Sequence, residues 1–182
     1  MHPAPLRQRR RHRLFSIDDG RSWSWSSDCA RDGDGCRYAE TAALRRAAIA
    51  WGPFTAALDL HCPWIEGFWN ERISLVGSSD AVIAADQRRF WSLVGERSRH
   101  DRLVVDAAAD YLPFGQDWNV AASYGGYRTC SRWAAEELRA PLAGTVEVSH
   151  GLVHDERIGQ ASARCFGARL ADGLVAYAEG MG

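Results

Sequence analysis

The sequence predicts an α/β fold built on a largely buried sheet. Segments with strand character alternate with segments of helical spacing along the chain, which is typical of α/β layers. Two strand segments, 55–60 and 72–76, are short apolar runs of the kind found in buried strands. The length of 182 residues, with 46% hydrophobic residues and 8 Trp, fits one globular domain of ordinary size.

The expected elements follow from local pattern and punctuation. The Ala-rich segment 38–50 predicts a helix that ends at Trp51-Gly52-Pro53, and the strand 72–76 closes at Gly77-Ser78-Ser79-Asp80. Helical spacing predicts further helices at 86–98, 101–111, 131–138 and 156–177, and β pattern predicts a strand at 144–148. The aromatic, glycine-bearing stretch 116–127 has the composition of a loop over a site.

Residues 1–36 differ from the rest and are expected to form an irregular, disordered tail before a domain at 37–182. They contain the basic run 7–13 but show neither structural period. Because the net charge of the whole chain is −1, we expect no nucleic-acid partner.

The cysteine pattern and the lack of long apolar stretches indicate the compartment. The five Cys are an odd set without a C-x-x-C pair, which favours reduced thiols over a disulfide framework or a zinc knuckle. No stretch approaches the roughly 18 apolar residues of a membrane span, and no signal peptide is recognisable. We therefore expect a cytoplasmic protein with no membrane partner.

Two polar residues interrupt the predicted strands. His61 stands at the carboxyl end of strand 55–60, where open α/β sheets bind ligands, although a histidine there is more often a hydrogen-bonded core residue than a metal ligand. Asp59 points to the same face and could orient the imidazole. Glu147 lies within the apolar T-V-E-V, which indicates either a functional carboxylate or an edge strand whose Glu faces water.

Several motifs together resemble the carboxyl-terminal half of a zinc carboxypeptidase of the carboxypeptidase A-like superfamily. They are L-D-L-H-C-P-W-I at 58–65, T-V-E-V at 145–148 and A-R-C-F-G-A-R-L-A at 163–171, and the resemblance covers about residues 37–178. It implies part of an α/β/α sandwich around a mixed sheet. It also implies hydrolysis of carboxy-terminal peptide bonds, or of amides in some branches, so the expected partner is a peptide or small amide substrate.

The resemblance implies roles for individual residues. His61 matches the position of the third zinc ligand and Glu147 that of the catalytic glutamate, so one zinc ion is the expected cofactor. Catalytic zinc keeps three protein ligands and one open position for water. The phenol that the family places after Trp-Ala is absent at Trp133-Ala134-Ala135, and Tyr124 or Tyr127 could contact substrate instead.

The sequence departs from the family in its ligand set. The family's other two ligands come from a His-x-x-Glu motif, and none of the six histidines here is followed by Glu three residues later. We therefore expect a truncated or degenerate copy that is weakly active or inactive. A sheet without its amino-terminal strands should expose an edge that favours self-association.

Two other functions remain open from the sequence. The chain could be a non-catalytic domain that binds a ligand through aromatic residues such as Trp118 and Tyr124, although aromatic abundance is more often core packing. It could also be a zinc amidohydrolase that acts on a small amido substrate.

Overall fold

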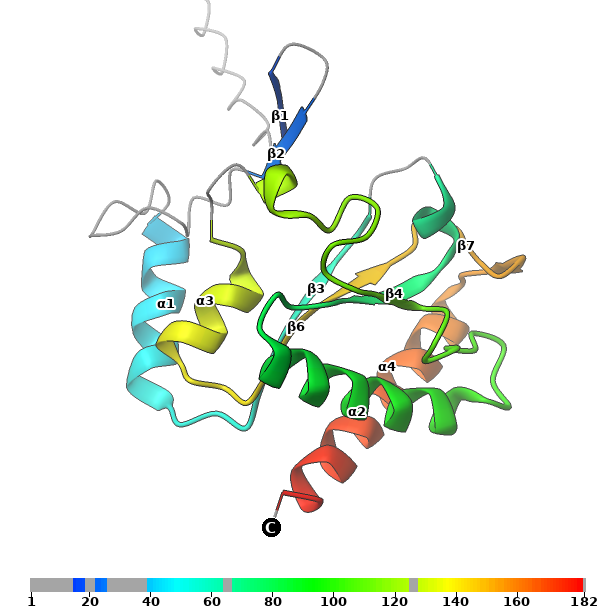
Figure 1. The fold of residues 1–182 in the computed structure, drawn as a ribbon. Coiled ribbons are helices and arrows are strands. Elements are labelled where there is room, and N and C mark those ends of the chain that lie inside the picture. Colours follow the sequence, from blue (N-terminus) through cyan, green and yellow to red (C-terminus); the bar gives the residue numbers. More distant parts are fainter. Residues whose placement is uncertain (1–14, 19–21, 26–38, 64–66, 125–127, 182) are drawn as a thin grey trace, which may run out of the picture.

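A mixed four-stranded sheet lies at the centre of the molecule (Figure 1). The computed structural model describes residues 15–18, 22–25, 39–63, 67–124 and 128–181. β6 (Leu142–Val148) is central; it pairs parallel with β3 (Ala56–His61) and antiparallel with β4 (Ile73–Val76). β4 in turn pairs parallel with β5 (Tyr111–Leu112), which gives the order β3-β6-β4-β5. The predicted α/β class is confirmed.

The other elements surround this sheet. They are the hairpin β1 (Phe15–Asp18) and β2 (Ser22–Trp25), the hairpin β7 (Leu152–Val153) and β8 (Glu156–Arg157), the helices α1 (Ala39–Trp51), α2 (Ala81–Ser98), α3 (Cys130–Glu137) and α4 (Gln160–Glu179), and the 3-10 turns η2 (Phe68–Glu71) and η3 (Ala121–Tyr124). Residues 1–36, expected to be irregular, thus contain the β1–β2 hairpin; the rest of that segment lies outside the described residues.

Helices cover both faces of the sheet. Alternate residues of a strand point to opposite faces, so Leu142 and Val146 of β6 face the main core, whereas Ala143 faces the other side. The main core contains side chains of α2 and α4, and the smaller one contains Trp133 and Ala134 of α3 with Ala48 of α1. Figure 1 shows α1 beside α3 and α2 crossing α4. The arrangement is a sandwich with one helix pair on each face.

The contact between α2 and α4 depends on a small residue. Gly173 of α4 is buried, and a β-carbon there would lie 2.7 Å from Cγ2 of Val94 on α2. One turn further along, the rings of Phe90 and Tyr177 meet edge to face at 6.4 Å. The absence of a side chain at Gly173 therefore sets how closely the two helices approach.

Two helices begin at different residues than the spacing predicted. α2 begins at Ala81 instead of 86, because the Asp80 side chain accepts hydrogen bonds from the backbone N–H groups of Val82 (2.8 Å) and Ile83 (3.2 Å). α4 begins at Gln160 instead of 156, because residues 156–157 pair with β7 as β8.

The helix predicted at 101–111 is wrong. Leu103 and Val105 are buried on either side of the exposed Val104, and residues 101–106 form bends and irregular structure instead of a helix. A turn follows, in which the Asp106 side chain accepts from the N–H groups of Ala108 and Ala109. The Asp110 side chain accepts from the N–H of Asp106 at 2.8 Å. Side-chain hydrogen bonds from Asp thus replace the helical pattern that the Ala-rich sequence favours.

Asp110 also joins three parts of the chain. Its carboxylate is fully buried and accepts from Nη1 of Arg72 at 2.7 Å, and it lies 3.0 Å from Nε2 of His154. Its backbone oxygen accepts from Nε1 of Trp91 at 3.1 Å. The start of β4 and the β7–β8 turn are therefore joined to the Asp110 side chain, and α2 is joined to its backbone.

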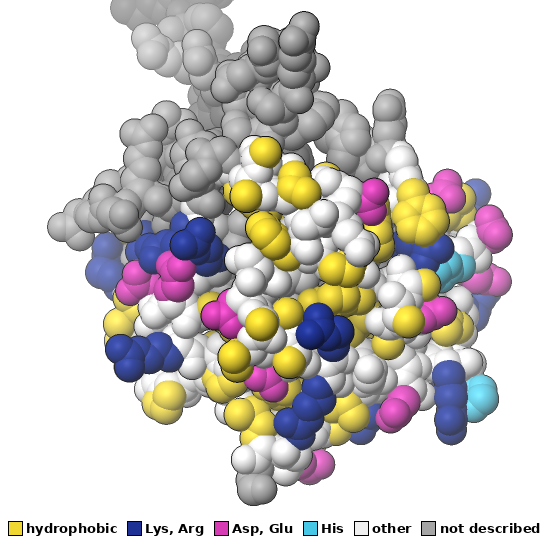
Figure 2. Space-filling model, viewed as in Figure 1, with side chains coloured by type: hydrophobic (Ala, Val, Ile, Leu, Met, Phe, Trp, Pro, Cys, Tyr) yellow, Lys and Arg dark blue, Asp and Glu magenta, His cyan; other side chains and the backbone are white. Residues whose placement is uncertain are grey.

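One edge of the sheet is open among the described strands. β3 pairs with β6 alone there, and Leu60 on it is 61% exposed. α1 adds further exposed apolar side chains, with Trp51 77% exposed. On the face shown in Figure 2, apolar side chains are surrounded by interspersed acidic and basic ones. Self-association through the β3 edge stays a prediction.

No helix in the described part of the chain is both long and apolar enough to cross a membrane.

Substitution of Gly173 tests the helix contact. We expect Gly173→Ala to lower the free energy of unfolding by about 1–3 kcal/mol, because the new methyl group must displace Val94. Gly167→Ala is the matched control in the same helix, since nothing lies within 4 Å of a β-carbon there. It should stabilise by up to about 1 kcal/mol through helix propensity. Urea denaturation measures both; equal effects would contradict the close contact.

Candidate functional site

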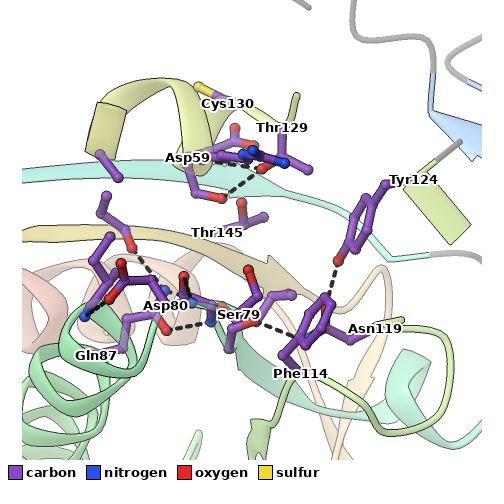
Figure 3. Close-up of a pocket in the computed structure, with 18 of the residues that line it drawn as sticks. Asp59, Ser79, Asp80, Gln87, Phe114, Asn119, Tyr124, Thr129, Cys130 and Thr145 are labelled. Carbon is purple, nitrogen blue, oxygen red and sulfur yellow. Dashed lines mark hydrogen bonds between the residues drawn. The ribbon is translucent and has the colours of Figure 1, made fainter. Parts of the chain in front are cut away.

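A cavity of about 780 Å³ lies over the face of the sheet that carries Asp59 and Thr145 (Figure 3). Its walls come from β3 and β6, the connection from β4 into α2, the first half of α2, the segment 114–124 and α3. Ala143, Thr145 and Glu147 of β6 line it, together with Asp59 and His61 of β3. This volume falls in the usual range for small-molecule sites.

Strand register brings the two predicted site residues together. β3 and β6 run parallel, and His61 is the register partner of Glu147, as Asp59 is of Thr145. The residues are 86 positions apart in sequence (147 − 61), yet they are direct neighbours across the sheet. Both side chains line the cavity. β6 lies between β3 and β4, so the alternative in which Glu147 faces water on an edge strand is wrong.

Glu147 is a buried carboxyl group. It is 3% exposed, and its Oε2 has no hydrogen-bond partner among the described residues. Burial raises the pKa of Glu147 from its usual 4.5 to about 7; the nearby His61 opposes this rise and the charge of Asp59 adds to it. At neutral pH the group can therefore both accept and donate a proton.

His61 is held between two acidic groups. Its Nδ1 lies 3.6 Å from Oδ2 of Asp59, the residue predicted to orient it. Burial acts to lower the pKa of His61, but the interaction with Asp59 and the charge of Glu147 outweigh it and raise the pKa. Since a metal ligand must be the neutral imidazole, these acids favour the protonated form that competes with metal.

Gln87 of α2 forms the wall of the cavity opposite α3. Its Nε2 donates to the backbone oxygens of Ala143 (2.8 Å) and Val76 (3.3 Å), and its Oε1 accepts from the N–H of Ser78 at 2.8 Å. The side chain is 1% exposed. α2 is thus joined through one amide to both β4 and β6.

Asn119 fixes the segment that covers the cavity. Its Nδ2 donates to the oxygens of Gly77 (2.9 Å) and Leu112 (3.0 Å), and its Oδ1 accepts from the hydroxyl of Tyr124 at 2.6 Å (Figure 3). Burial, and to a lesser extent the charge of Glu147, raises the pKa of Tyr124 to about 12. Tyr124 therefore keeps its proton and lines the cavity; its contact with a substrate stays a prediction.

Tyr127 lies outside the described residues. His150, in the loop after β6, has its Nε2 3.1 Å from the backbone oxygen of Pro63 and so joins the loops that follow β6 and β3.

Sequence reasoning missed Gln87 and Asn119. Gln87 stands in the polar D-Q-R-R stretch of an amphipathic helix, which indicates a solvent-facing position, and Asn119 stands in a loop. Both act by hydrogen bonds to backbone atoms from distant strands, and no local pattern signals such bonds.

The described residues do not provide a complete zinc site. No group of three or more His, Cys, Asp or Glu side chains among them is arranged to hold a metal ion. His61 remains the one residue there with an assigned ligand role, and its closest acidic neighbours are Asp59 and Glu147. The described donor set therefore does not by itself fit a catalytic zinc.

Comparison of this chain with protein families, curated proteins and solved structures finds no match.

The burial of Glu147 predicts a pH-dependent stability. Its pKa in the folded protein lies above the unfolded value, so the folded state holds the proton more tightly. The destabilisation it causes is absent below about pH 4.5, grows between pH 4.5 and 7, and is constant above. At pH 8 we expect Glu147→Gln to be more stable than the wild type by roughly 3 kcal/mol, a gain that vanishes at pH 4.

Urea denaturation across this pH range measures the difference. Glu96→Gln, on the exposed side of α2, serves as the control and should show no growth of the difference with pH. A constant difference between wild type and Glu147→Gln would contradict the raised pKa.

Proposed function

We propose that this chain carries part of a hydrolytic centre of the zinc carboxypeptidase type, which cleaves carboxy-terminal peptide or amide bonds. The observation that supports it best is the register pairing of His61 with Glu147 at a cavity. The resemblance assigns metal binding and proton transfer to these two positions, and the parallel pairing of β3 and β6 makes them neighbours although they are 86 positions apart (147 − 61) in sequence.

Glu147 has the properties of a proton shuttle. With a pKa of about 7 it can take a proton from an attacking water and give it to the departing amine at neutral pH. Asp59 and His61 beside it place a negative and a positive charge, respectively, close to Glu147. Tyr124, protonated and hydrogen-bonded to Asn119, offers a fixed phenol at the same cavity for substrate contact.

Zinc would be held through His61. A zinc ion bound at such a site polarises the scissile carbonyl and acidifies the water. The described residues supply no complete ligand set for such an ion. Weak zinc binding and low activity by this chain alone are part of the proposal.

A non-catalytic ligand-binding domain is the second candidate. Phe114, Trp118 and Tyr124 line the cavity along one segment, and aromatic side chains are common in small-molecule sites. A zinc amidohydrolase would use the same centre on a small amide, so substrate choice alone separates it from a peptidase.

Zinc affinity tests the role of His61. We expect the wild type to bind zinc weakly, and His61→Ala to lower that affinity by at least about tenfold, because the assigned donor is lost. Equilibrium dialysis followed by metal analysis measures both. His100→Ala, at an exposed position in the turn after α2, is the matched control and should bind as the wild type does. Stoichiometric zinc that persists in His61→Ala would remove His61 from the site.

Turnover of a blocked dipeptide with added zinc tests Glu147. We expect slow release of the carboxy-terminal residue, and a loss of about 10²–10⁴-fold in kcat/KM in Glu147→Gln, because the amide cannot move the proton. Glu96→Gln should retain the wild-type rate. Reproducible turnover in Glu147→Gln would contradict the assignment, whereas ligand binding without any turnover would favour the binding domain.

A further inference from the structure

Two neighbouring residues of β4 and β6 each carry a buried polar atom that has no hydrogen-bond partner among the described residues. Ser74 of β4 is 0% exposed, and neither its Oγ nor Oε2 of Glu147 has a hydrogen-bond partner in the described part of the chain. Ser74 and Glu147 are direct register partners in the antiparallel β4–β6 pair. Opposite side chains in such a pair share a face, with β-carbons about 4.5–5.5 Å apart.

A link between these two atoms would satisfy both. A buried hydroxyl or carboxyl oxygen without a partner is costly, and most such groups in native proteins are hydrogen-bonded. A serine hydroxyl both donates and accepts, so it can serve the charged and the neutral carboxyl group alike. The flanking residues Ile73 and Leu75 offer only apolar side chains.

The three residues form a row across the sheet. His61 of β3, Glu147 of β6 and Ser74 of β4 are successive register partners, so Glu147 has His61 on one side and Ser74 on the other. His61 and Glu147 line the cavity, whereas Ser74 is not among the described residues that line it. Ser74 can therefore act on a substrate only through Glu147.

We propose that Ser74 is a positioning residue that binds Oε2 of Glu147, directly or through one trapped water. This bond fixes the plane of the carboxyl group, so that its other oxygen is held towards the cavity beside His61. The catalytic consequence rests on the proposed function, but the bond itself does not. The polar residue inside the apolar run I-S-L-V is then explained in the same way as the Glu inside T-V-E-V.

Infrared spectroscopy tests the bond without any substrate. The carbonyl stretch of protonated Glu147 is identified in metal-free protein as the band that Glu147→Gln removes. We expect it to move to higher wavenumber in Ser74→Ala, because a hydrogen bond to the carboxyl group is lost, and to stay near the wild-type position in Ser74→Thr, which keeps the hydroxyl.

The control for this measurement is another buried serine. Ser98→Ala removes a hydroxyl that contacts Gly95 and Val105, away from the sheet, and should leave the band in place. An unchanged band in folded Ser74→Ala would overturn the proposal. If Ser74→Ala does not fold, Ser74→Cys decides instead: its weakly donating thiol should also raise the wavenumber, and an unchanged band there overturns the proposal equally.

Kinetics then separate this proposal from the proposed function. With a substrate that the wild type hydrolyses, Ser74→Ala should lower kcat on the order of tenfold at unchanged KM, while Ser74→Thr restores it. An unchanged kcat in Ser74→Ala would overturn the positioning role and leave the hydrolase intact. Absence of wild-type turnover would instead count against the hydrolase, and the infrared band would still decide the bond.

Discussion

The pairing of β6 with β3 on one side and β4 on the other is the constraint on which the rest of the molecule depends. It places apolar residues of β6 against α2 and α4 and polar ones beneath the cavity. It also aligns His61, Glu147 and Ser74 in one row. Successive residues of a strand point to opposite faces of the sheet, so the backbone hydrogen bonds that fix the register of β6 position both the core and the site.

The site combines one group that destabilises the fold, Glu147, with two buried amides that stabilise it, Gln87 and Asn119. Glu147 is buried, which favours its neutral form and raises its pKa to about 7, close to neutral pH. The stability lost there is offset by the apolar core behind the strand. Gln87 and Asn119, by contrast, are buried amides whose hydrogen bonds are made to backbone atoms, so they rigidify the walls without an unpaired charge.

Much of the fold could be predicted from the sequence, because strands and helices leave local patterns of apolar residues. The strand that ends at His61 and the α/β class follow from apolar runs and their punctuation. The helix prediction for 101–111 was wrong because Asp106 and Asp110 bind backbone groups and distant side chains. These bonds outweigh the helix propensity of Ala. His61 and Glu147 could be singled out as polar residues in apolar strands, but their adjacency depends on long-range register. Ser74 carried the same signal and was overlooked.

The register pairing has a consequence for how this chain can vary through evolution. The distance between His61 and Glu147 is set by two strands, not by the residues that connect them, so insertions or deletions in the surface loops between β4 and β6 leave the pair intact. A shift of β6 by one residue in its register with β3 has the opposite effect. It would place Val146 or Val148 beside His61 and direct the Glu147 side chain into the apolar core. The centre is therefore tolerant of length changes and intolerant of shifts in alignment.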